Sequence, residues 1–135
     1  MKRTKLDNAM LCYCGSQKKF ETCCEPLLTR SQAATSAESL MRSRYAAFCT
    51  KDMDYLFETT HPSARASFDR ESNTTWAEQA HFEKLEVLGA SQMGDRGFVN
   101  FKAHFTIDGV AQVHREASSF RRENGIWYFV DGKVS

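Results

Sequence analysis

Four of the five cysteines in the chain lie close together, at Cys12, Cys14, Cys23 and Cys24. Two ligands one residue apart, a loop, and then two adjacent ligands can close a tetrahedral metal site. Four thiolates with no open position are typical of structural zinc, which binds sulfur at about 2.3 Å, and tetrahedral sulfur also suits iron. Disulfides or free thiols are the alternatives, and they are disfavoured because the adjacent Cys23 and Cys24 are poorly placed to bridge each other.

The residues between these cysteines fit a metal-binding loop. Gly15 permits a turn that lets backbone N–H groups approach the sulfurs. Lys18 and Lys19 can offset the surplus negative charge of four thiolates around a divalent ion. The fifth cysteine, Cys49, lies in a helical stretch and is interpreted as a small buried hydrophobic residue.

Length and composition restrict the classes of protein to which the chain can belong. Its 135 residues make one ordinary domain with room for a small appendage, and 41% hydrophobic with 26% charged residues is typical of a globular protein. The formal net charge of +1 excludes a dominant electrostatic attraction to nucleic acid or to an anionic membrane. No apolar run spans a membrane, and no apolar segment follows the basic start at 2–5 as it would in a signal peptide. We therefore expect a reducing, cytoplasmic location.

The middle of the chain, over 31–81, has the pattern of helices. Thr35 and Glu38 form a capping box ahead of an apolar stripe that includes Leu40, Met41, Tyr45 and Phe48. A second, short helix is predicted to begin at Asp52 or Asp54 and to end near Thr60, since Pro62 disfavours a helical His61. A third is predicted to open near Trp76, after a capping box at Thr75 and Glu78.

The last third of the chain predicts a β-meander. Asp108-Gly109 and Asn124-Gly125 are strong signals for two-residue hairpin turns. They predict strands near 97–107, 110–123 and 126–131, joined by a first strand near 82–90. Helices followed by a meander indicate an α+β fold in which the helices pack on one face of an antiparallel sheet.

The hairpin register places polar groups on the apolar face of that sheet. With two-residue turns, Phe101 faces Glu116 and Ala103 faces His114, while Ser118 faces Asp131, although one β-bulge would move part of this row. Arg44 lies near the middle of the helical stripe beside Tyr45, and a buried guanidinium needs a carboxylate. We therefore predict that Arg44 pairs with Glu116 or, failing that, with Asp131. The row is then either a structural ion pair or the polar lining of a pocket between the helices and the sheet.

Several stretches resemble known families. Cys12 to Cys24, with Gly15 and Ser16 after the second cysteine and the basic pair Lys18-Lys19 before Cys23-Cys24, resembles the SEC-C zinc-binding motif found on the preprotein translocase motor. In the motif, Gln17 replaces a frequent glycine. Most of the chain resembles the YchJ family of bacterial proteins, through the stretches 40–48, 54–56, 61–63, 97–99 and 123–128.

The resemblance implies a middle domain similar to the nuclear transport factor 2-like fold, in which helices pack in a cone against a curved antiparallel sheet. It also implies a zinc knuckle over 1–30 ahead of an α+β domain over 31–135. Many family members carry a second SEC-C motif at the C-terminal end, which residues 131–135 do not supply. The family provides a fold and a metal but no reaction.

These features are compatible with three functions. The first is a non-enzymatic protein that docks a protein partner, such as a chaperone, a translocation component or the ribosome, through its zinc knuckle. The second is a small-molecule binder or an acid–base enzyme that uses the cone pocket, with His114, Glu116 and Asp131 as titrating groups and Tyr45 or His61 as donors. The third is the handling of zinc or iron, which is disfavoured because closed four-thiolate sites hold their metal.

Overall fold

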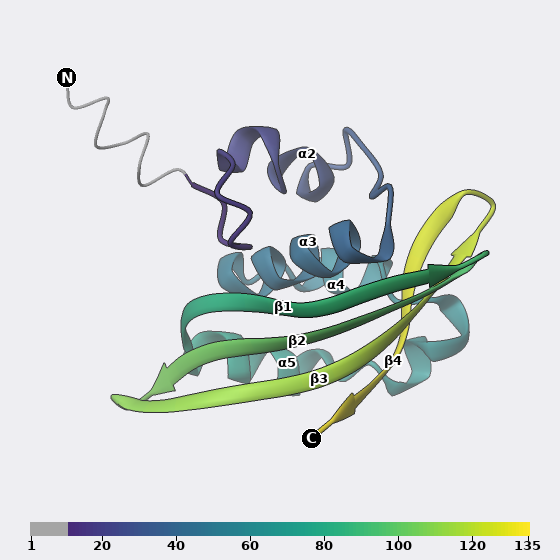
Figure 1. Ribbon diagram of the computed structural model, residues 1–135. Coiled ribbons are helices and arrows are strands. Elements are labelled where there is room, and N and C mark those ends of the chain that lie inside the picture. The colour runs from purple at the N-terminus through teal and green to yellow at the C-terminus, as the bar shows by residue number, and fades with distance from the viewer. Residues whose placement is uncertain (1–10) are drawn as a thin grey trace.

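The computed structural model describes residues 11–135, so the basic start and the first ten residues of the predicted knuckle lie outside the described residues. Four strands follow a series of short and long helices (Figure 1). The elements are η1 (Phe20–Thr22), α2 (Glu25–Leu28), α3 (Ala37–Thr50), α4 (Met53–Glu58), η2 (Pro62–Ser67), α5 (Arg70–Gln79), β1 (His81–Met93), β2 (Arg96–Ile107), β3 (Val110–Glu123) and β4 (Ile126–Val134).

The four strands form one antiparallel sheet in the order β1-β2-β3-β4, as the meander predicted. Both predicted two-residue turns are present. Asp108 and Gly109 have φ values of 51° and 77°, and Asn124 and Gly125 have φ values of 52° and 78°. Positive φ at both central residues matches the twist of the flanking strands, and for this reason Asp-Gly and Asn-Gly specify these hairpins.

Side-chain hydrogen bonds identify the residues that cap the N-termini of the helices. The Ser36 side chain, rather than that of Thr35, accepts from the backbone N–H of Ser39 at 3.0 Å and begins α3. Asp52 begins α4, as predicted, by accepting from Tyr55 N at 3.0 Å.

The predicted start of the third helix is wrong. Asp69 caps α5 by accepting from Ser72 N at 3.0 Å, so Thr75 and Trp76 lie inside the helix. An aspartate whose carboxylate binds the backbone two or three residues later is a sufficient cap, and it starts the helix before the Thr75 box is reached.

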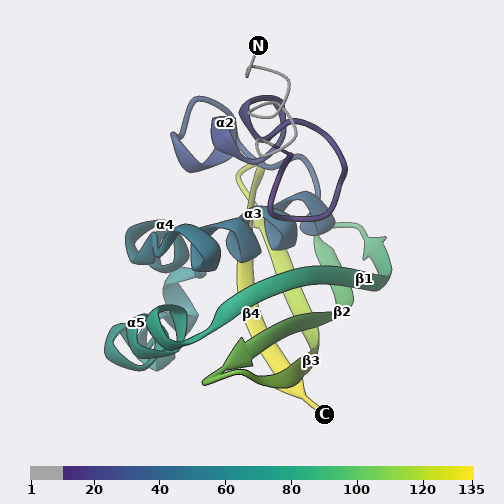
Figure 2. The same ribbon diagram turned by 90° about the vertical axis from the view of Figure 1, so that its left-hand side faces the viewer.

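The sheet curves around α3, with α4 and α5 to one side of that helix (Figure 2). This is the predicted cone-like α+β arrangement. α3 contributes Leu40, Met41 and Tyr45 to the main apolar cluster, where they meet Val99 and Phe101 of β2 among others. A second cluster joins the far side of α3 to α2, α4 and α5. Burial alternates along β2, so its apolar side chains face the helices.

The register agrees with the prediction except at one place. Ala103 opposes His114, Phe101 opposes Glu116 and Phe120 opposes Phe129. Between Ser119 and Phe120 the register shifts by one residue, so that Ser118 opposes Gly132 rather than Asp131. An extra residue in β4 forms a bulge, and a bulge moves every later pair along the strand. The predicted pairing of Ser118 with Asp131 is therefore wrong.

Within residues 11–135, no helix has the length and apolar character needed to cross a membrane.

Candidate metal centre and cone pocket

The four clustered cysteines meet in space. The sulfur atoms of Cys12, Cys14, Cys23 and Cys24 all lie within 4.8 Å of one another. Four metal–sulfur bonds of about 2.3 Å define a tetrahedron with edges of about 3.8 Å. The distance from Cys14 Sγ to Cys23 Sγ is 3.7 Å. The set therefore fits one metal ion held by four thiolates, a donor chemistry that suits zinc or iron.

Local backbone bonds position these ligands. Cys12 N donates to Lys18 O at 2.8 Å, and Cys23 N donates to Phe20 O at 3.0 Å in the single turn of η1. Gly15 has the positive φ of 81° that its predicted role in the turn requires. Ser16 Oγ lies 3.1 Å from Cys23 Sγ, so Ser16 supports the ligand set directly. The electrostatic role of Lys18 and Lys19 stays a prediction.

Without a bound cation, thiols of this cluster differ in pKa. Hydrogen bonds from Cys12 and Cys24 hold the pKa of Cys14 well below that of an ordinary thiol. The pKa of Cys24 is raised because its proton is shared with Cys12 and Cys14, and its buried position adds to this. A divalent cation would displace the remaining protons, so metal uptake should release protons and weaken at low pH.

The cysteine loop is seated on the rest of the fold. Arg42 of α3 donates from Nη1 to Cys14 O at 2.6 Å and from Nε to Glu38 at 3.1 Å. A Cβ atom at Gly15 would lie 3.2 Å from Leu85 O of β1, so the loop approaches the sheet closely. Cys12, Cys14 and Cys24 share the main apolar cluster with α3 and the sheet.

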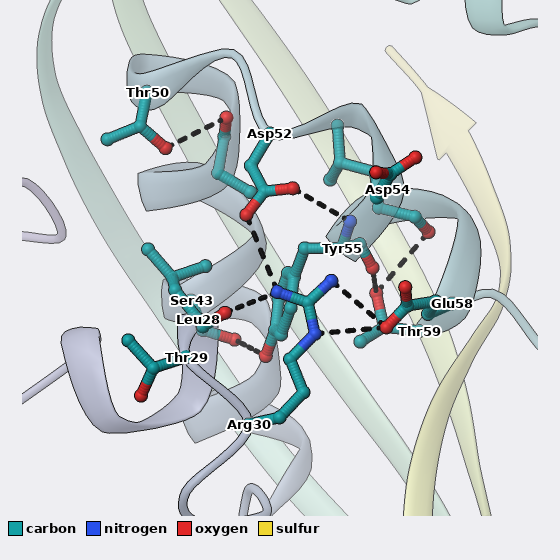
Figure 3. A network of polar contacts seen from close by, with 12 residues as sticks. Leu28, Thr29, Arg30, Ser43, Thr50, Asp52, Asp54, Tyr55, Glu58 and Thr59 are labelled. Atoms are coloured by element: carbon teal, nitrogen blue, oxygen red, sulfur yellow. Dashed lines mark hydrogen bonds and ion pairs between the residues drawn. The ribbon is translucent and has the colours of Figure 1, made fainter.

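A polar network joins the end of α2 to α4 (Figure 3). Arg30 Nε donates to Glu58 at 3.0 Å, and its Nη1 lies 3.6 Å from Asp52. Its guanidinium also lies 5.2 Å from the ring centre of Tyr55, whose hydroxyl meets Ser43 Oγ at 2.6 Å. The Arg30 side chain is 41% exposed, so solvent screens these pairs and each contributes little to stability.

A cavity of about 440 Å³ lies between α3, η2, α5 and the concave face of the sheet. Of the predicted pocket residues, five line it: Arg44, Tyr45, His114, Glu116 and Asp131. Asp131 stays exposed at its rim. Ser118 is buried and reaches the site only through Glu116, to which it donates a hydrogen bond at 2.6 Å. The polar row on the sheet therefore belongs to a pocket.

The predicted ion pair of Arg44 is absent. In the described part of the chain no carboxylate oxygen lies within 4.0 Å of its guanidinium, so neither Glu116 nor Asp131 pairs with it. Desolvation lowers the pKa of Arg44 to about 10, which still leaves it charged at neutral pH.

Arg44 finds its acceptors where α4 ends. Its Nη1 donates to Leu56 O at 2.9 Å, to Thr59 Oγ1 at 2.6 Å and, more weakly, towards Thr60 Oγ1 at 3.4 Å. The guanidinium carbon lies 4.5 Å from the centre of the Phe129 ring. Carbonyl and hydroxyl oxygens at a helix C-terminus attract a cation. The prediction of an ion pair considered only carboxylates as partners of Arg44 and not the C-terminal end of α4.

Glu116 is satisfied by its neighbours on β3. His114 Nε2 lies 2.8 Å from one carboxylate oxygen, and Ser118 Oγ donates to the other. Burial by itself would raise the pKa of Glu116, but the hydrogen bonds from His114 and Ser118 outweigh it and hold that pKa below the ordinary value. Gly132 leaves the room that this carboxylate fills.

Replacing Glu116 with Gln should lower the free energy of unfolding by about 1–2 kcal/mol at neutral pH, because charged acceptors form stronger hydrogen bonds. A glutamate whose pKa is lower in the folded state than in the unfolded state stabilises the fold at pH values above its unfolded pKa, which is about 4.3. This stabilisation is lost as the pH falls through the folded-state pKa. The difference between wild type and Glu116→Gln should therefore shrink in acid, which urea unfolding across that pH range measures. Glu78→Gln, at an exposed site, is the control; a difference that is constant with pH would contradict the role assigned to Glu116.

Several residues that line the cavity were not predicted from the sequence. Trp76, Thr60 and Gly132 line it, and the ring of Trp76 lies 5.6 Å from that of His114. A correct start for α5 would have placed Trp76 on the inner side of its helix. His61 does not line the cavity: it is buried, and it caps η2 by accepting from Ser63 N at 3.1 Å.

Comparisons with known proteins agree with this geometry. A family model described as the YchJ middle NTF2-like domain matches residues 36–132, and the SEC-C motif matches residues 11–26. A UPF0225 protein from Geobacter sulfurreducens is 43% identical over 125 residues, which span 90% of this chain and 78% of the relative.

Two solved structures are also similar. The solution structure of a SEC-C motif containing protein from Rhodopseudomonas palustris has 49% identity and a TM-score of 0.87, over 93% of this chain and 99% of that one. The crystal structure of a SEC-C motif containing protein from Psychrobacter arcticus has 28% identity and a TM-score of 0.81, over 96% and 85% of the two chains. On its motif, its fold and its relatives, the chain belongs to the YchJ (UPF0225) family of SEC-C motif proteins with a nuclear transport factor 2-like middle domain.

Proposed function

We propose that the four-cysteine site holds a structural zinc ion and that the knuckle it orders docks a protein partner, without catalysing a reaction. The observation that carries the proposal is the closed set of four sulfurs, which leaves no ligand position for water or substrate. Zinc supplies about 10–16 kcal/mol of binding free energy in finger peptides, enough to order a segment too short to build its own core. Iron in the same site, and metal delivery, are the competing outcomes.

The surface of the knuckle supports docking. Leu11 and Tyr13, on either side of Cys12, are 48% and 49% exposed. The Tyr13 ring packs edge-on against Phe20 at 5.4 Å, which fixes its orientation. Lys18 and Lys19 are exposed on the same loop. An apolar pair beside two cations suits a protein segment with apolar and acidic side chains, such as a chaperone, a translocation component or a ribosomal protein would present.

We propose that this knuckle, over 1–30, and the cone domain, over 31–135, act as separate units in a reducing cytoplasm. Contacts of Arg42 and Arg30, and the apolar cluster that Cys12, Cys14 and Cys24 share with α3 and the sheet, seat one unit on the other, while Leu11 and Tyr13 stay exposed.

Substituting both Leu11 and Tyr13 with serine should abolish partner capture while the protein keeps its metal, because neither side chain is a ligand. Affinity capture with tagged wild type and variant, followed by mass spectrometry and a binding assay with the purified partner, measures the effect. We expect a loss of affinity of at least about tenfold, since exposed aromatic anchors dominate small interfaces.

The matched control is Val110→Ser with Val113→Ser, which removes two exposed apolar side chains from the β2–β3 hairpin end. This control should keep the partner. Equal losses in both variants, or a partner that binds the Leu11 and Tyr13 variant as well as wild type, would overturn docking through the knuckle.

A further inference from the structure

The cone cavity contains a buried cation, Arg44, that no carboxylate of the described residues contacts directly, although the charge of Glu116 acts on it at longer range. Arg44 is only 7% exposed, and its hydrogen bonds in the described chain all come from Nη1. No buried side-chain nitrogen or oxygen among the described residues lacks a partner. The Nε and Nη2 groups are therefore not sealed in the core, and because Arg44 lines the cavity they are accessible from it.

The orientation of this guanidinium restricts what it can bind. One face lies over the Phe129 ring at 4.5 Å, and Nη1 is held by the end of α4. The free donors, Nε and Nη2, form the edge of the planar group that pairs with a carboxylate through two parallel hydrogen bonds. The site is built before any ligand arrives, since the acceptors on Nη1 fix the side chain.

The other ionisable groups of the cavity do not supply the missing anion. Both oxygens of Glu116 already accept hydrogen bonds, from His114 and from Ser118. Asp131 is exposed at the rim. Arg44 is the one lysine or arginine in the described lining of the cavity, and a single guanidinium neutralises a monoanion but only half of the charge of a phosphate dianion.

The walls show what the rest of the ligand should be. Seven Phe, Tyr or Trp side chains line the cavity: Tyr45, Phe48, Phe68, Trp76, Phe82, Phe101 and Phe129. Several meet edge to face, such as Phe48 with Trp76 at 5.1 Å and Trp76 with Phe82 at 5.2 Å. Aromatic walls with one convergent charged group are typical of small-molecule sites, and about 440 Å³ is within their usual range.

From this geometry we propose that the cone cavity binds a small aromatic monocarboxylate, with its carboxylate on the free edge of Arg44 and its ring among the aromatic walls. The site is separate from the zinc knuckle and independent of docking through it. A buried charge without a directly bonded anion does not favour folding. The carboxylate of the ligand would give the Arg44 guanidinium that anion, which explains why an arginine is placed at this position.

The test uses 2-naphthoate and its neutral analogue 2-naphthamide as probes of the whole protein. Titration calorimetry measures their affinities, and the change in tryptophan fluorescence, to which Trp76 at the cavity wall contributes, follows binding. We expect 2-naphthoate to bind at least tenfold more tightly than 2-naphthamide. Arg44→Met should weaken 2-naphthoate at least tenfold and leave 2-naphthamide unchanged, because only the charged probe uses the guanidinium.

Two controls keep the test decisive. Arg122→Met removes an arginine that also lies over an aromatic ring, that of Trp127 at 5.3 Å, but outside the cavity lining, and it should not change either affinity. Arg44→Met should fold, because Leu56 O still accepts from Thr60 Oγ1 at 2.8 Å. If it does not, Ala103→Met, which fills the cavity from β2, should abolish binding of both probes.

The proposal is overturned if wild type binds neither probe at millimolar concentration, or if the two probes bind equally. It is also overturned if 2-naphthoate binds Arg44→Met, or in its place Ala103→Met, as tightly as wild type.

Discussion

Replacing Cys23 and Cys24 together with serine should reduce the metal content from about one ion per chain to none. Serine hydroxyls are poor ligands for zinc, and two remaining thiolates cannot close a tetrahedral site. The knuckle should lose its order, because its fold depends on the metal. Elemental analysis of protein purified without added metal, together with native mass spectrometry, measures the stoichiometry and identifies the ion.

The same variant should still melt in one cooperative transition, but at a lower temperature. Cys12, Cys14 and Cys24 pack in the main cluster with α3 and the sheet, so a disordered loop withdraws these contacts from the cone domain. A loss comparable to a large-to-small core substitution, about 2–4 kcal/mol, corresponds to a fall in Tm of about 10 °C for a domain of this size. Calorimetry measures it.

Cys49→Ser is the matched control, since Cys49 is the cysteine outside the cluster. Its thiol is half-buried and burial raises its pKa to about 12, so it behaves as a packing residue, as the sequence indicated. This variant should keep its metal. If the Cys23 and Cys24 variant has no cooperative transition at all, the knuckle and the cone domain fold as one unit, and the division at residue 30 is wrong.

Gly132→Ala should lower the free energy of unfolding by about 2–4 kcal/mol. A Cβ atom at Gly132 would overlap the carboxylate of Glu116, coming within 2.6 Å of its Cδ. Glu116 would have to leave its hydrogen bonds with His114 and Ser118 while remaining largely buried, and both overpacking and a buried unpaired charge are costly. Chemical denaturation measures the loss.

Two comparisons isolate this cause. Gly89→Ala makes the same chemical change on β1, where a Cβ would have nothing within 4 Å, and it should be nearly neutral. In a Glu116→Ala background the overlap is gone, so Gly132→Ala should then cost less than about 1 kcal/mol. If the cost is the same with and without the Glu116 side chain, the backbone of β4 and not the carboxylate causes it.

The elements and the hairpin register were predictable because their signals are local. Positive φ at Asp108-Gly109 and Asn124-Gly125 fixes the pairing of the neighbouring strands within a few residues of each turn. The bulge that separates Ser118 from Asp131 was not predictable, because it depends on how β4 packs across the curved sheet. The wrong start of α5 has a different origin: two capping signals compete, and only the folded chain decides between Asp69 and Thr75.

By itself, the sequence determined the four metal-ligand candidates and the polar character of the sheet face, because spacing along one chain segment or one hairpin sets both. The tertiary structure alone decided the partners of Arg44. A long side chain on α3 can reach acceptors on any element that packs nearby, and the carbonyl and hydroxyl groups at the end of α4 lie closer than the carboxylate of Glu116. The packing of α3 against α4 and the sheet, and not the residue type, decides whether a buried charge is neutralised by another side chain or faces a cavity.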